Sequence, residues 1–106
     1  MKSIQYETQT IRIGQTRREN WDLLEQSKGT DMLFHLSSFP SCYVVLETDG
    51  GCSQKTIVYC ARLCTQYTKY KHLKNVYVDY TLCKNVKKGE CVGEIVYKSK
   101  VNRIKV

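Results

Sequence analysis

The chain has 106 residues, a length that fits one domain and leaves no room for a second. Its 42% hydrophobic and 25% charged residues exclude a disordered or fibrous chain. No stretch approaches the ~20 apolar residues of a membrane span, and the first residues contain no apolar signal region, so we expect a soluble, cytoplasmic protein without a membrane partner.

The net charge of +7 is unevenly distributed along the chain. Residues 1–54 hold five basic and seven acidic side chains, whereas residues 55–106 hold twelve basic and three acidic ones. Such an asymmetry favours a polyanionic partner, usually nucleic acid. The alternative is that the lysines only keep the protein soluble.

Hydrophobic periodicity predicts the elements in chain order. Alternation predicts one or two opening strands over 4–13, and the capping-box pair Thr16 and Glu19 predicts a short helix to about residue 26. Strands are expected near 32–36 and at 43–46, the second covered on both faces. A longer helix at about 54–67 presents an apolar stripe of Ile57, Cys60, Ala61 and Cys64. Further strands follow at 76–82, with one face on the core, at 95–97 and at 101–106.

These elements predict a single α+β domain over 1–106, with a mostly antiparallel or mixed sheet, one short helix and one long helix. The six cysteines are expected to be buried free thiols, because the cell interior is reducing and only Cys60 and Cys64 have a spacing close to that of zinc ligands. We therefore expect no metal and no cofactor.

Sequence signatures of catalysis are missing: the chain has no nucleophile elbow, zinc-protease motif, phosphate loop or dinucleotide fingerprint. His35 and Asp31 lie on one strand about 13 Å apart, too far to form a general-base pair. Asp31 is better explained as beginning the strand or capping a turn. A small nuclease using His35 is the least favoured function.

Two groups of basic residues are candidate nucleic-acid contacts. Arg17 and Arg18 fall in the first turn of the short helix, where the helix dipole disfavours cations, and a bound phosphate would explain them. The alternative is that both side chains extend into solvent. Lys84, Lys87 and Lys88 follow the strand at 76–82 in an expected loop with no acidic neighbour, and Thr81 is a candidate to face outward and offer its hydroxyl to phosphate.

The run 67–74 interleaves tyrosines with lysines and a histidine, a pattern that suits stacking on nucleic-acid bases. It also follows the long helix, whose negative end attracts cations without any ligand. Helix-end electrostatics is the favoured interpretation.

Four blocks follow one another along the chain: residues 14–23 (GQTRRENWDL), 31–36 (DMLFHL), 79–88 (DYTLCKNVKK) and 93–97 (GEIVY). Together they resemble the motifs of the NFACT-R (RNA-binding) domain family, in the same order. The resemblance covers about residues 10–106. It places family motif positions at Gly14, Asn20, Asp31, His35, Lys84 and Lys88. Two positions depart from the family pattern: Tyr43 stands where a histidine is usual, and Leu33 where a tryptophan is usual.

The resemblance implies an α+β, non-catalytic module that binds RNA, either tRNA or ribosomal RNA, in translation or ribosome-associated quality control. The predicted RNA contacts are Arg17, Arg18, Asn20, His35, Thr81, Lys84, Lys87 and Lys88. The alternative is a protein–protein adaptor that docks on a ribosomal or quality-control partner without touching RNA. For the RNA function, we expect the basic second half to fold beside Arg17 and Arg18.

Overall fold

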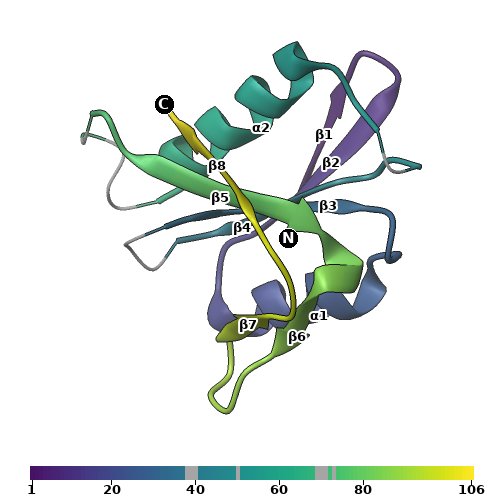
Figure 1. Ribbon diagram of the computed structural model, residues 1–106, viewed down its shortest axis with the longest axis vertical. Coiled ribbons are helices and arrows are strands. Elements are labelled where there is room, and N and C mark those ends of the chain that lie inside the picture. The colour runs from purple at the N-terminus through teal and green to yellow at the C-terminus, as the bar shows by residue number, and fades with distance from the viewer. Residues whose placement is uncertain (38–40, 50, 69–71, 73) are drawn as a thin grey trace.

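The computed structural model describes residues 1–37, 41–49, 51–68, 72 and 74–106, which form two helices and eight strands (Figure 1). The helices are α1 (Arg17–Gln26) and α2 (Gln54–Gln66). The main sheet has six strands, in the spatial order β1 (Lys2–Tyr6), β2 (Gln9–Gly14), β4 (Tyr43–Leu46), β3 (Met32–Leu36), β5 (Tyr77–Leu82) and β8 (Asn102–Lys105). A second sheet is the hairpin of β6 (Val86–Lys88) and β7 (Ile95–Tyr97).

The predicted α+β class is confirmed, and every strand pairing in the described residues is antiparallel. Helix α2 covers one face of the main sheet, while α1 and the β6–β7 hairpin lie on the other (Figure 1). Each face has its own apolar cluster. The cluster beneath α2 includes Phe34, Val44 and Cys60, and the cluster beneath α1 includes Leu23, Leu33 and Val45.

Local sequence signals explain where the helices begin. The Thr16 hydroxyl accepts a hydrogen bond from the Glu19 amide at 3.1 Å, and a Glu19 carboxylate oxygen accepts one from the Gln15 amide at 3.0 Å. This is the capping box that the sequence predicted. Ser53 caps α2 in the same way through the Thr56 amide. The buried stripe of α2 and the burial of β4 on both faces also agree with the sequence patterns.

Two expectations about the segment 76–88 are wrong. Its first part, β5, buries both faces in its middle rather than one, because the α1 layer packs on the face opposite α2. The expected loop that follows is instead a 3-10 turn, Cys83–Asn85, leading into β6. Three residues are too few for a strand pattern to be visible in the sequence.

The cysteines are buried at positions 42, 60, 64 and 83, as expected. Cys52 is half-buried and Cys91 is exposed, so the expectation of buried thiols was wrong for Cys91. None of the helices among the described residues is both long and apolar enough to cross a membrane.

Candidate nucleic-acid interface

The two arginines at the start of α1 have different surroundings. Arg18 is exposed, and its Nε atom lies 3.2 Å from the Asp22 carboxylate one turn along the helix. Arg17 instead packs beside Gly93 of the hairpin: a Cβ built on Gly93 would stand 2.9 Å from the Cβ of Arg17. None of the ion pairs among the described residues includes Arg17. Arg17 is therefore the better placed of the two to hold an external anion.

Asn20 joins α1 to the sheet. Its Oδ1 atom accepts a hydrogen bond from the Tyr43 amide at 3.2 Å, and its Nδ2 atom donates to the Ser41 carbonyl at 3.4 Å. Gly14, which pairs with Tyr43 in the β2–β4 register, leaves the space for this amide: a Cβ there would stand 2.7 Å from Oδ1. Asn20 is 6% exposed, so its main visible role is to position α1.

The β6–β7 hairpin is held against α1 by polar and aromatic contacts. The Trp21 indole donates to the Glu94 carbonyl at 2.9 Å, and the Lys88 ammonium lies 5.0 Å from the centre of the same ring. Lys88 also pairs with Glu25. The Tyr43 hydroxyl donates to the Gly93 carbonyl at 2.5 Å, and burial raises the pKa of Tyr43 above its usual value. These contacts bring the hairpin next to the beginning of α1.

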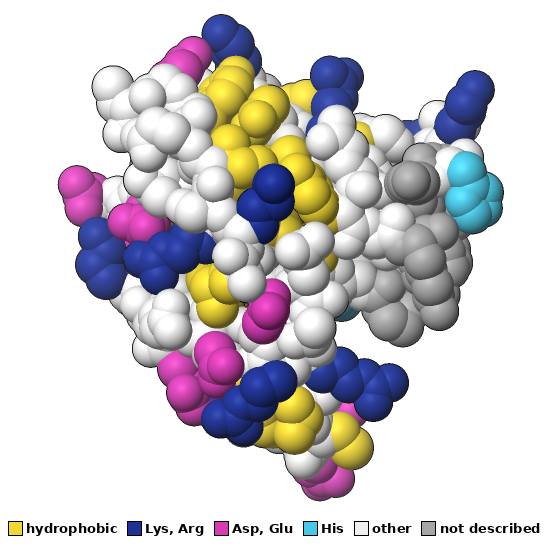
Figure 2. Space-filling model, turned by 180° about the vertical axis from the view of Figure 1, so that it is seen from behind, with side chains coloured by type: hydrophobic (Ala, Val, Ile, Leu, Met, Phe, Trp, Pro, Cys, Tyr) yellow, Lys and Arg dark blue, Asp and Glu magenta, His cyan; other side chains and the backbone are white. Residues whose placement is uncertain are grey.

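A cleft of about 420 Å³ opens where the hairpin, the start of α1 and the sheet meet. Helix α1 and the β6–β7 hairpin together form a lobe, and Figure 2 shows a hollow that separates this lobe from the rest of the molecule. The cleft is lined by Arg17, Asn20, His35, Ser41, Cys91, Val92, Gly93 and Glu94. The cleft thus brings together three of the eight RNA contacts predicted from the sequence, namely Arg17, Asn20 and His35.

His35 forms an inner wall of this cleft. Its ring meets the Tyr43 ring edge-on, with the ring centres 5.1 Å apart. Burial lowers the pKa of His35 below its usual value, partly opposed by the charge of Asp79 on the neighbouring strand. The imidazole is therefore neutral near pH 7, and it can hydrogen-bond to a ligand but adds no positive charge.

The three predicted lysines do not line the cleft. The Lys84 amide donates to the Gly29 carbonyl, which places Lys84 beyond the end of α1, about 15 Å from Arg17 at its start. Lys87 is exposed on β6, and Lys88 is occupied by Trp21 and Glu25. Lys84 and Lys87 remain accessible along the same lobe.

Thr81 is 5% exposed, so the expectation that it faces outward is wrong. Its hydroxyl accepts a hydrogen bond from the Asn85 side chain at 3.0 Å. Asp31, one of the positions that match the family motifs, caps the turn before β3, as expected. Its carboxylate accepts hydrogen bonds from the backbone amides of Lys28 and Thr48. Of the run 67–74, residues 69–71 and 73 lie outside the described residues.

The fold largely cancels the charge of this lobe. The expectation that the basic second half folds beside Arg17 and Arg18 holds only in part. Lys88 lies against α1 and pairs with Glu25, whereas Lys84 lies beyond the other end of α1, and Arg103 and Lys105 lie on β8. Over residues 17–26 and 83–97 the sequence has five basic and five acidic side chains. The basic ones are Arg17, Arg18, Lys84, Lys87 and Lys88, and the acidic ones are Glu19, Asp22, Glu25, Glu90 and Glu94.

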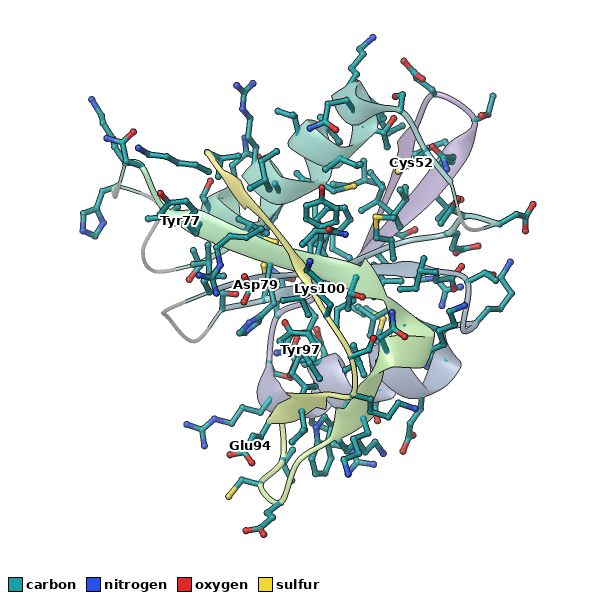
Figure 3. All side chains as sticks on the ribbon, in the orientation of Figure 1. Cys52, Tyr77, Asp79, Glu94, Tyr97 and Lys100 are labelled. Carbon is teal, nitrogen blue, oxygen red and sulfur yellow. The ribbon has the colours of Figure 1, made fainter. Side chains whose placement is uncertain are left out.

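Sequence reasoning missed a polar group on the sheet beside the cleft. Asp79 of β5 accepts hydrogen bonds from the Ser37 hydroxyl at 2.6 Å and from Arg103 Nε of β8 at 2.8 Å. Tyr97 lies nearby, and burial raises its pKa to about 12 (Figure 3). The sequence contained one signal for a charged group on this part of the sheet: residues 95–106, which include Arg103, contain four bases and no acid.

Comparisons with known proteins agree with this architecture. The model of the family described as the NFACT protein RNA binding domain matches residues 4–103. The solved C-terminal part of the fibronectin/fibrinogen-binding protein from Streptococcus suis superposes with a TM-score of 0.85 over 93% of this chain, at 24% sequence identity. The present chain spans 41% of that one, and the likeness shows a shared fold. Among curated proteins, none matches the sequence.

Proposed function

The chain belongs to the family of NFACT protein RNA-binding domains, and on this premise we propose that residues 1–106 form a single, non-catalytic module whose cleft and α1–hairpin lobe hold RNA. The RNA is a tRNA or a ribosomal RNA, bound in the cytoplasm during translation or ribosome-associated quality control. The observation that carries the assignment to this site is the convergence of Arg17, Asn20 and His35 on one cleft.

The residues of the cleft divide the work of binding. The Arg17 guanidinium, which has no carboxylate partner among the described residues, supplies a forked donor for a phosphate. His35, kept neutral by burial, offers hydrogen bonds to a base or ribose. Asn20 holds α1 against β4, so that Arg17 and His35 keep their relative positions.

Lys84 and Lys87 extend the contact along the lobe, away from the cleft. Together with Arg17 they are the predicted basic residues outside the ion pairs of the described chain. If these three neutralise three phosphates, RNA affinity falls roughly 20- to 40-fold between 50 and 200 mM salt. Such contacts fix the position of the RNA backbone and add no sequence preference.

Fluorescence anisotropy with a labelled tRNA tests this function. Arg17→Glu is expected to lower the affinity at least tenfold, because it removes one phosphate contact and places a carboxylate in the cleft. Arg62→Glu, an equal change of charge on α2 across the sheet, is the matched control and is expected to have a much smaller effect. Equal losses in the two variants would show that only net charge matters and would remove the cleft from the proposal.

The adaptor function is the second candidate, and the charge balance of the α1–hairpin lobe favours it. A surface with as many acids as bases attracts a polyanion weakly at long range. An adaptor would retain its partner in pull-downs after RNase treatment and would bind tRNA no better than an unrelated basic protein does. Loss of the partner with RNase, together with tight tRNA binding, would favour the RNA function instead.

A further inference from the structure

A strongly basic stretch of the chain includes the edge strand of the main sheet. Residues 95–106 contain Lys98, Lys100, Arg103 and Lys105 and no acidic residue. They include β8, which pairs only with β5 among the described strands (Figure 1). Unlike the lobe of α1 and the hairpin, this edge keeps most of its positive charge, because Arg103 is the one of these four bases that has an acidic partner among the described residues.

The strand register places the basic side chains beside an aromatic one. Tyr77 of β5 is opposite Lys105 of β8, and Asp79 is opposite Arg103, so all four side chains are on one face of the sheet. The Arg103 guanidinium neutralises Asp79, with Nε 2.8 Å from the carboxylate. None of the ion pairs of the described residues includes Lys100 or Lys105.

Tyr77 is one of the few large hydrophobic residues of the described chain that is strongly exposed, at 48% of its surface. Figure 3 shows Tyr77 near one end of β5 and Lys100 where the chain enters β8, with Asp79 between them. Residues two apart on β8, such as Arg103 and Lys105, are separated by roughly 7 Å. We refer to Tyr77, Lys100, Arg103 and Lys105 as the β8 surface.

An exposed tyrosine with Lys105 opposite it, and with Lys100 five residues before Lys105 in the chain, suits one ligand in particular. The flat ring can stack on a base, and the two lysines, which have no acidic partner among the described residues, can hold phosphates of the same strand. In an A-form duplex the bases are stacked on one another and are not available to a side chain. The charge and the aromatic ring together therefore favour a single strand over a duplex.

We infer that the β8 surface binds a single-stranded RNA segment, with one base on Tyr77 and phosphates at Lys100 and Lys105. This inference rests on the proposed RNA function but concerns a different surface from the α1–hairpin lobe. A tRNA or ribosomal RNA held in the cleft would extend an unpaired segment from His35 along the α1 side of the sheet, past Asp79, to β8.

The electrostatic part of the inference, the phosphate contacts of Lys100 and Lys105, is tested by measuring the affinity for a labelled single-stranded RNA of about 15 nucleotides at several salt concentrations. Lys100→Ala/Lys105→Ala is expected to reduce the slope of log affinity against log salt by about 1.4, corresponding to two lost phosphate contacts. Lys55→Ala/Arg62→Ala removes the same charge from α2, on the other side of the sheet, and is expected to leave the slope unchanged. Equal slopes for the two double variants would overturn the inference.

The stacking part is tested at Tyr77, whose exposure means that its replacement should leave the fold intact. Tyr77→Phe keeps a ring and is expected to bind the single strand like the wild type. Tyr77→Ala is expected to weaken binding roughly tenfold. The loss is expected with the single strand and not with the same sequence as a duplex. An equal loss with both ligands, or no loss with either, would refute base stacking.

The two proposals fail in different ways. If Arg17→Glu weakens tRNA binding while the β8 variants bind both RNAs normally, the cleft stands and the β8 surface does not. If the β8 variants lose the single strand while Arg17→Glu binds normally, the β8 surface stands and the cleft assignment fails. If the wild-type protein binds neither RNA, both proposals fail.

Discussion

The amide of Asn20 offers the sharpest test of how α1 is held in place. Asn20→Ala removes the acceptor of the Tyr43 amide and the donor to the Ser41 carbonyl. Tyr43 is 1% exposed, so its N–H is left without a partner away from water, which costs about 1–3 kcal/mol. The lost bond to Ser41 adds about 0.5–1.5 kcal/mol.

The free energy of unfolding should therefore fall by about 2–4 kcal/mol, measured by urea denaturation followed by circular dichroism. The denaturant slope should stay unchanged, because the same surface is exposed on unfolding. Asn102→Ala, the same change at an exposed position of β8, is the matched control and should cost less than about 0.5 kcal/mol.

A second variant tests the role of the space at Gly14. Gly14→Ala should also destabilise the protein, because its Cβ would stand 2.7 Å from Asn20 Oδ1 and 3.0 Å from the Asn20 amide nitrogen. In the double variant Gly14→Ala/Asn20→Ala the clash with the side chain is gone, so the combined loss should be smaller than the sum of the single losses. An Asn20→Ala loss below about 0.5 kcal/mol, or strictly additive losses, would refute this account of the α1–β4 junction.

Three further predictions concern the hairpin and the cleft. Gly93 has a φ of +90° and a Cβ there would stand 2.9 Å from Arg17, so Gly93→Ala should lower the thermal midpoint by several degrees, while Gly51→Ala, which meets nothing within 4 Å, should not. Burial lowers the folded-state pKa of His35 below 6.5, so the unfolded chain binds more protons. The contribution of neutral His35 to the free energy of unfolding is fully present above about pH 6.5 and is lost as the pH falls through the folded-state pKa. The urea midpoint of His35→Gln should therefore change less than that of the wild type between about pH 7.5 and about pH 5. Trp21→Phe loses the indole hydrogen bond to the hairpin, so hydrogen exchange should quicken at the β6–β7 amides and not in the main sheet; an equal change in both would contradict this.

The sequence predicted those features of the site that depend on neighbours in the chain. Thr16 and Glu19 cap α1 through amides within one turn, so the position of Arg17 in that turn followed from the sequence alone. The α2 stripe and the β4 run were visible for the same reason, since helical and extended periodicity is a local property. The family blocks added His35 and Asn20 as candidates, but the sequence did not show that both line one cleft.

The surroundings of the basic residues could be learned only from the tertiary structure. Lys88 looked isolated in the sequence, yet it lies against Trp21 and Glu25, residues more than sixty positions earlier. Thr81 was expected to be accessible, but its strand is covered on both faces by layers far apart in the chain.

Composition by itself determined the overall positive charge of this protein, and periodicity determined its α+β class. Only the packing of α1 against the hairpin decided where the charge is cancelled, and only the β5–β8 register decided where it remains beside an exposed tyrosine. The physical reason is that electrostatic energy depends on distance in space, whereas sequence patterns report only distance along the chain.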